Sequence, residues 1–140
     1  MKPIIKVSFS LESRNADFSE IDNLLQIKPS KYREIFPPNS IAVPFWETEV
    51  VDNSFEVEEV VQTLLNRIQP KANMIKELCC RFHMTSTLVI RITAKYENGP
   101  FISLSASQLT FLSAIGSQLI VDLEGLYPDE EGVHHEMNLC

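Results

Sequence analysis

Apolar and polar residues alternate along three stretches of the chain. From Ile5 to Leu11, apolar residues stand at every odd position, with Lys or Ser at positions 6, 8 and 10. A similar alternation occurs within residues 41–51 and again over residues 88–95. A period of two predicts strands that have one apolar and one polar face. The apolar residues within 118–123 predict the final strand of the chain.

A stripe of apolar residues at helical spacing predicts the strongest helix, over residues 55–69. The stripe consists of Val57, Val60, Val61, Leu64, Leu65 and Ile68. Pro70 stops this helix, and a second helical segment is expected from Lys71 to about Arg81.

Capping signals predict two more helices. Asp17 and Glu20 have the spacing of a capping box, and the helix that they start ends before Pro29. Ser105 and Gln108 have the same spacing at the start of a last helix, which Gly116 closes. Residues 28–40 hold three prolines without a strong period and are interpreted as a loop.

These elements predict a single α+β domain over residues 1–127, followed by a mobile acidic tail over 128–140. Asn98-Gly99 is a turn dipeptide, after which residues 101–104 are expected to return as a short partner strand. Strands with one polar face favour a mostly antiparallel sheet with helices packed on one face. The expected architecture is a ferredoxin-like split β-α-β variant with an extra central helical segment.

The net charge of −7 lies entirely in the last third of the chain. No Lys or Arg follows Lys95, and the acids after that point account for the whole excess. They are Glu97, Asp122, Glu124, Asp129, Glu130, Glu131 and Glu136. Such a field repels phosphate backbones, so we expect no nucleic acid as partner. An acidic tail is usually a solvating feature, and a basic protein partner is the alternative interpretation.

The expected location is a reducing cytoplasm. Lys6 and Ser8 interrupt the apolar N-terminal stretch, which argues against a signal peptide. Residues 109–126 are interrupted by polar and acidic side chains, so we expect no contact with a membrane. Three cysteines, an odd number, do not form a disulfide framework.

No motif predicts a catalytic group, a metal or a cofactor. The four glycines form neither of the common phosphate-binding loops and no nucleophile elbow. Cys80 and His83 are the nearest approach to a thiolate pair, but no third group orients them. His134 and His135 stand near Cys140 without the paired spacing of a zinc site. Cys79 falls on an apolar helical stripe and is expected to pack as a small hydrophobe.

Two groups of residues are the candidates for a binding site. Glu47 and Glu49 point to one face of their strand, where acid–base chemistry is conceivable, but an exposed polar sheet face is the simpler interpretation. Trp46 is most simply a core anchor. The functional alternative places it in an aromatic surface together with Tyr32, Arg33 and Phe36 of the proline-rich loop.

The chain resembles an uncharacterised bacterial family, domain of unknown function 4279, over most of residues 4–124. The similarity rests on the strand Val7–Leu11, the helix end Leu24–Ser30, the central Trp46, and the apolar and proline residues of 64–70. The closing segment 109–123 is also similar. A glycine-bearing turn common in the family is replaced here by residues 32–38. The resemblance implies a small bacterial α+β domain, and by analogy a role as an immunity protein.

Three functional hypotheses follow. The first is a non-catalytic, immunity-like protein-binding module that neutralises a basic toxin and gains association rate from charge steering. The second is a small-ligand-binding domain or enzyme that uses the Glu47/Glu49 strand face and the loop from Tyr32 to Phe36. The third is a structural domain that forms a homodimer through an exposed strand.

Overall fold

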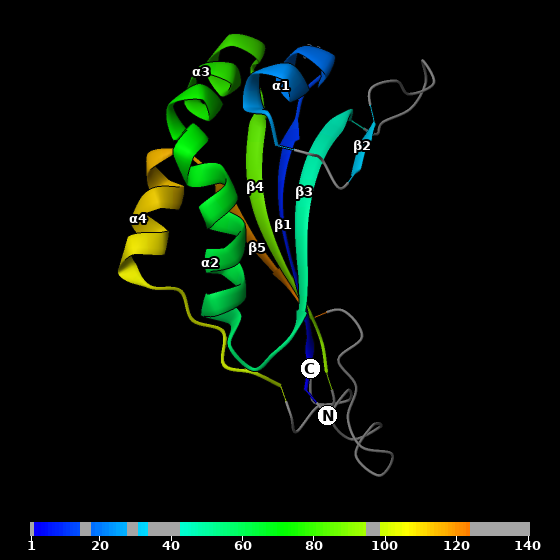
Figure 1. Cartoon of the computed structure of the whole chain (residues 1–140), viewed down its shortest axis with the longest axis vertical. Coiled ribbons are helices and arrows are strands. Elements are labelled where there is room, and N and C mark those ends of the chain that lie inside the picture. Colours follow the sequence, from blue (N-terminus) through cyan, green and yellow to red (C-terminus); the bar gives the residue numbers. More distant parts are fainter. Residues whose placement is uncertain (1, 15–17, 28–30, 34–42, 95–98, 124–140) are drawn as a thin grey trace, which may run out of the picture.

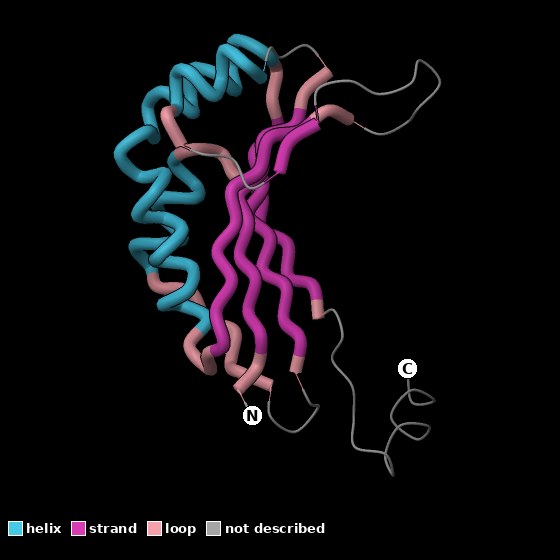
Figure 2. The backbone as a smooth tube through the Cα atoms, turned by 45° about the vertical axis from the view of Figure 1, so that its right-hand side comes forward, coloured by secondary structure: helices cyan, strands magenta, loops and turns pink. Residues whose placement is uncertain are grey.

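A computed structural model of the chain describes residues 2–14, 18–27, 31–33, 43–94 and 99–123. Helices and sheet form two layers, with the helices on one side of the sheet (Figures 1 and 2). The strands are β1 (Ile4–Glu12), β2 (Lys31–Arg33), β3 (Phe45–Asn53), β4 (Thr85–Thr93) and β5 (Gln118–Asp122). The helices are α1 (Phe18–Leu25), α2 (Val57–Ile68), α3 (Ala72–Phe82) and α4 (Ala106–Ala114), and the 3-10 turn η1 (Gln69–Lys71) joins α2 to α3.

The described strands form one sheet in the order β2-β3-β1-β4-β5. The central strand β1 is antiparallel to β3 and to β4 along its whole length, and β2 is antiparallel to β3. Only the β4–β5 pair is parallel among these strands. The predicted α+β class, with a mostly antiparallel sheet and helices on one face, is therefore confirmed.

The ferredoxin-like detail is not confirmed. Because β3 and β4 both run antiparallel to β1, they are parallel to each other, and α2 and α3 connect them across the inserted β1. This is one split β-α-β unit. The next helix, α4, leads instead to β5, which lies directly beside β4 and parallel to it. The second connection is thus an ordinary β-α-β crossover, and β5 forms the border of the sheet.

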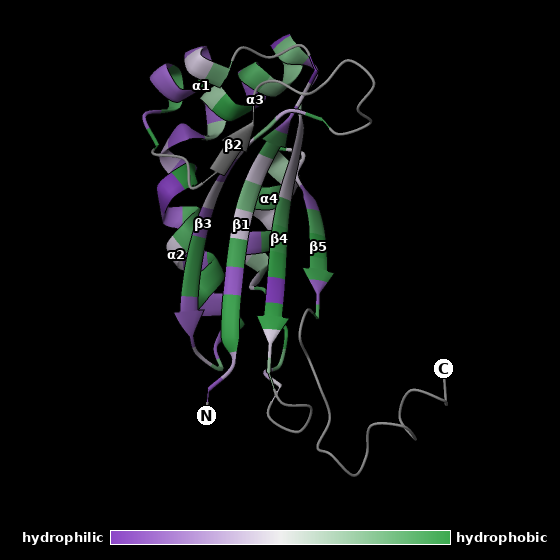
Figure 3. Ribbon diagram, turned by 90° about the vertical axis from the view of Figure 1, so that its right-hand side faces the viewer, coloured by the Kyte–Doolittle hydropathy of each residue, from purple (hydrophilic) through white to green (hydrophobic). Residues whose placement is uncertain are grey.

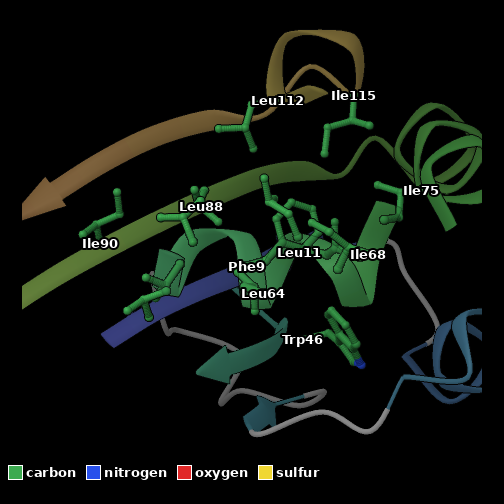
Figure 4. Packing of buried hydrophobic residues seen from close by; sticks show 14 of the residues in the cluster. Phe9, Leu11, Trp46, Leu64, Ile68, Ile75, Leu88, Ile90, Leu112 and Ile115 are labelled. Carbon is green, nitrogen blue, oxygen red and sulfur yellow. The ribbon is translucent and has the colours of Figure 1, made fainter. Parts of the chain in front are cut away.

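The core lies between the helices and the face of the sheet that carries the odd-numbered residues of β1. Ile5, Val7, Phe9 and Leu11 are fully buried there, as the alternation in the sequence predicts. The predicted stripe of α2 is buried along its whole length. Figure 4 shows side chains of β1, α2, α3, β4 and α4 meeting in this layer. The sheet and the helices therefore share one continuous core.

The helix ends follow the local signals of the sequence. The capping box of α4 is formed: the Ser105 hydroxyl accepts from the Gln108 N–H, and the Gln108 side chain accepts from the Ser105 N–H. Gly116 then adopts a φ of +69°, a left-handed conformation that suits glycine. Asp17, predicted to cap the first helix, lies outside the described residues.

Two predictions about irregular segments are wrong. The sequence predicts a loop over residues 28–40, but Lys31–Arg33 form β2 at the sheet edge beside β3. Residues 101–104 form no strand, and Phe101 is 95% exposed. The physical reason for the second difference is that β1 and β5 occupy both sides of β4, so a returning strand finds no free edge there. In the described part of the chain, no helix is both long and apolar enough to cross a membrane.

Candidate functional site: the open face of the sheet

The even-numbered residues of β1 point away from the helices, toward a side of the sheet that we call the open face. Figure 3 views the sheet from this side. The strand register places polar residues next to one another across it: Ser10 lies opposite Glu47 of β3 and opposite Thr87 of β4. Thr87 in turn lies opposite Gln118 of β5. One polar row therefore crosses four strands.

This row forms the middle of a hollow of about 410 Å³. Its lining residues come from β1, β3, β4 and β5 and are Ser10, Glu12, Phe45, Glu47, Thr85, Thr87, Val89, Arg91, Gln118 and Ile120. The set combines two carboxylates, one guanidinium, three hydroxyls, an amide and three apolar side chains. Such a mixture suits recognition of a ligand that has both charged and apolar parts.

One side-chain hydrogen bond and one ion pair link β5 to β4 at the hollow. Thr87 Oγ1 and Gln118 Oε1 are 3.4 Å apart, with the hydroxyl as donor. Arg91 Nε lies 3.7 Å from Asp122 Oδ2, and both of these side chains are partly exposed. A partly exposed pair contributes little to stability. The pair places the guanidinium of Arg91, the single cation in the lining, next to β5.

Ser8 lies beneath the open face, between Glu49 of β3 and Val89 of β4. Its side chain is fully buried, and within the described part of the chain its Oγ is the one buried side-chain polar atom that lacks a hydrogen-bond partner. A buried hydroxyl without a partner costs on the order of 1–3 kcal/mol. The strand thus carries a polar residue here at the expense of stability.

The structure places Trp46 and the Glu47/Glu49 pair on opposite faces of β3. Glu47 and Glu49 are both half-buried on the open face, and Glu47 lines the hollow. Trp46 lies on the opposite face, fully buried, and its indole N–H donates to Asp22 Oδ1 over 2.7 Å. This placement favours the interpretation of Trp46 as a core anchor.

Part of the proline-rich loop forms the edge strand β2. Tyr32 and Arg33 belong to β2, where they lie opposite Trp46 and Phe45 of β3. Phe36 lies outside the described residues. The predicted aromatic surface therefore stays a prediction, and Trp46 is turned away from the face that carries Glu47.

The cysteine and histidine residues in the described part of the chain lie away from the hollow. Cys80 is exposed and Cys79 is half-buried against the core. Burial raises the pKa of the Cys79 thiol, and a hydrogen bond with Ser86 opposes that rise. A raised pKa keeps the thiol protonated and poorly nucleophilic. His83 ends α3 with a φ of +52° and is exposed. Among the described residues, no three His, Cys, Asp or Glu side chains are grouped so as to hold a metal ion.

Sequence reasoning missed most of the hollow. The alternation identified Ser10 and Arg91 as polar-face residues of their strands, yet it did not bring them together with Thr85, Thr87 or Gln118. One signal in the sequence was available: within β1 the open-face residues have even numbers, and within β4 they have odd numbers, so each set points to one face of its strand. The strand order and register that unite them depend on contacts between distant parts of the chain.

These observations define an α+β domain whose sheet is covered by helices on one face and hollowed on the other. No curated protein and no solved structure matches the chain. A family model does match residues 3–126, with the description Domain of unknown function (DUF4279). The chain belongs to this family, as the resemblance noted in its sequence predicts.

Proposed function

We propose that the protein is a non-catalytic protein-binding module that binds a basic segment of its partner at the open face of the sheet. The observation that carries this proposal is the hollow of about 410 Å³ with Glu12 and Glu47 in its lining. Two carboxylates in the same lining as the apolar side chains Phe45, Val89 and Ile120 offer both charge and apolar contact. A polypeptide with Lys or Arg next to apolar residues has the matching chemistry.

The charge of the whole chain supports the same class of partner. With 19 acidic and 12 basic residues, the net charge is −7, and this excess attracts a basic protein over a longer distance than the hollow itself. Steering of this kind raises the association rate and weakens as salt is added. Neutralisation of a basic toxin in the cytoplasm, the role of an immunity protein, is the specific form of this function that we propose.

The chemistry of the reactive side chains is in keeping with binding rather than catalysis. The Cys79 thiol has a raised pKa, and Cys80 lies exposed on the surface of the helix layer, away from the hollow. The hollow itself contains hydroxyls, an amide, carboxylates and a guanidinium, and no Cys or His. These groups can bind a partner through charge, hydrogen bonds and apolar contact.

The experiment that tests the proposal compares two double variants of equal charge. Glu12→Gln/Glu47→Gln removes both carboxylates of the hollow, whereas Glu58→Gln/Glu59→Gln removes two exposed acids of α2 in the helix layer. Each variant changes the net charge from −7 to −5. Binding of the full chain to a synthetic peptide with alternating Lys and Leu is then measured by calorimetry at low and high salt.

We expect the hollow variant to weaken binding by about tenfold or more, because each lost charge contact at a binding site costs on the order of 1 kcal/mol. The helix variant should lose only the smaller, salt-sensitive contribution of net charge. Equal losses in the two variants would show that the peptide responds to overall charge and not to the hollow, and would refute the proposal.

A small-ligand-binding domain or an enzyme is the second candidate, since the hollow lies within the range of about 300–1,000 Å³ typical of small-molecule sites. This candidate differs from the protein-binding module in the size of the ligand, which is a small molecule and not a segment of a protein. A thermal shift of the full chain with a small polar metabolite, abolished by Thr87→Val but not by the helix variant, would favour this candidate. Binding of the peptide with no such metabolite shift would favour the protein-binding module.

A further inference from the structure

The border strand β5 is exposed along its entire length. Each of its five residues is exposed, and its only sheet neighbour among the described strands is β4. Leu119, Ile120 and Val121 are 42%, 48% and 42% exposed. Figure 3 shows α4 behind β1 and β4, while β5 lies beyond it at the edge of the sheet. The helix layer therefore does not cover β5, and the strand presents apolar side chains on both faces.

Proteins usually protect such an edge with Lys, Pro or a bulge, because its unpaired backbone groups attract another strand. In β5 only Asp122 carries a charge, and Arg91 of the neighbouring strand lies 3.7 Å from it. An edge that is apolar and weakly charged is suited to pairing with a further strand.

We propose that a second copy of this chain occupies the edge, with the two β5 strands paired antiparallel about a two-fold axis at Ile120. This inference is separate from the proposed binding function. In this register Ile120 faces Ile120 of the second copy, and Leu119 faces Val121. Asp122 faces Gln118, so that no two like charges are opposed. All five positions of β5 are thus matched with a residue of the same character.

The neighbouring registers are less favourable. An axis at Leu119 places Gln118 opposite Ile120 and Gly116 opposite Asp122. An axis at Val121 places Ile120 opposite Asp122. Both set an apolar side chain against a polar one and would leave polar groups poorly paired. The pattern of β5 is therefore self-complementary in one register, which is the requirement for an isologous two-fold interface.

The dimer would join two sheets into one and bring the two hollows together. Gln118 and Ile120 belong both to β5 and to the lining of the hollow. Across the axis, Asp122 and Ile120 of the second copy would continue that lining on the open face. Each copy would thus contribute side chains to the border of the other copy's hollow.

Net charge gives the dimer a distinct dependence on salt. Two copies, each with a charge of −7, repel one another, so screening by salt should strengthen their association. Binding of a basic partner should instead weaken as salt rises. The sign of the salt effect therefore separates this inference from the proposed function.

The test measures the association of the full chain by analytical ultracentrifugation over a concentration series up to the millimolar range. Ile120→Lys places two Lys side chains opposite each other at the axis and should weaken the dimer by about tenfold or more. The matched control is Val51→Lys on β3, a 51% exposed residue on the same open face but away from β5. Both positions are exposed, and far-ultraviolet circular dichroism verifies that both variants fold.

A second pair of variants tests the register. Gln118→Lys creates an opposite-charge pair with Asp122 of the second copy on each side of the axis and should tighten the dimer by about threefold to tenfold. Asn73→Lys on α3 makes the same change in net charge at an exposed helix position and should have a smaller effect. A monomer at every concentration and salt level would overturn the proposal. Equal effects of Ile120→Lys and Val51→Lys would overturn it as well.

Discussion

Replacing Gln108 by Ala is predicted to loosen the attachment of α4 to α2. The side chain of Gln108 is 1% exposed and makes three hydrogen bonds. Its Oε1 accepts from the Ser105 N–H over 3.0 Å. Its Nε2 donates to the Glu58 carbonyl over 2.9 Å and to Gln62 Oε1 over 3.2 Å. One residue therefore caps its own helix and links that helix to another.

The magnitude follows from these contacts. A hydrogen bond inside a protein contributes about 0.5–1.5 kcal/mol net, and a buried group left without its partner costs more than an exposed one. Three bonds removed together from a buried side chain predict a loss of about 2–4 kcal/mol in the free energy of unfolding. This is a large share of the roughly 5–15 kcal/mol that holds a domain of this size together.

Urea denaturation followed by tryptophan fluorescence measures this loss. Trp46 is the only tryptophan of the chain and is fully buried, so its emission reports unfolding of the core. Ser107→Ala is the matched control, an exposed neighbour in the same helix, and should change stability by less than about 0.5 kcal/mol. A loss below about 1 kcal/mol for Gln108→Ala would refute the reasoning, because it would show that water replaces the three contacts at little cost.

Three other changes have definite expected outcomes. Asp22→Ala leaves the buried indole N–H of Trp46 without its acceptor and should cost about 1.5–3 kcal/mol in urea denaturation, while Asp22→Asn, which keeps an acceptor, should restore most of it. Ser8→Ala removes a buried hydroxyl that has no partner and should raise the melting temperature by about 2 °C or more; a fall of several degrees would contradict the absence of a partner. Because burial raises the pKa of the Cys79 thiol, alkylation at neutral pH, read by peptide mass spectrometry, should reach Cys80 first, and Cys79 should react only as the pH rises toward its pKa. Equal rates at the two cysteines would contradict this order.

Local patterns were sufficient to predict most elements of the fold. The alternation from Ile5 to Leu11 and the stripe of α2 identify buried faces, because side-chain direction repeats with a fixed period in strands and helices. The capping box of α4 was equally visible, since both of its partners lie within four residues of each other. Even so, the sequence could not reveal that Nε2 of Gln108 reaches Glu58, fifty positions away.

The candidate site, in contrast, depends on the order and register of the strands. Ser10, Thr87 and Gln118 are unremarkable polar residues in three separate strands, and only the order and register of those strands make them neighbours. The same cause explains why residues 101–104 form no strand: in the sheet, β1 and β5 lie on the two sides of β4 and leave it no free edge. The periodicity of a strand indicates which of its faces is buried. Which strands pair depends on all strands together, because each strand has only two edges. The pairing is determined by contacts between residues far apart in the chain, so local sequence patterns do not reveal it.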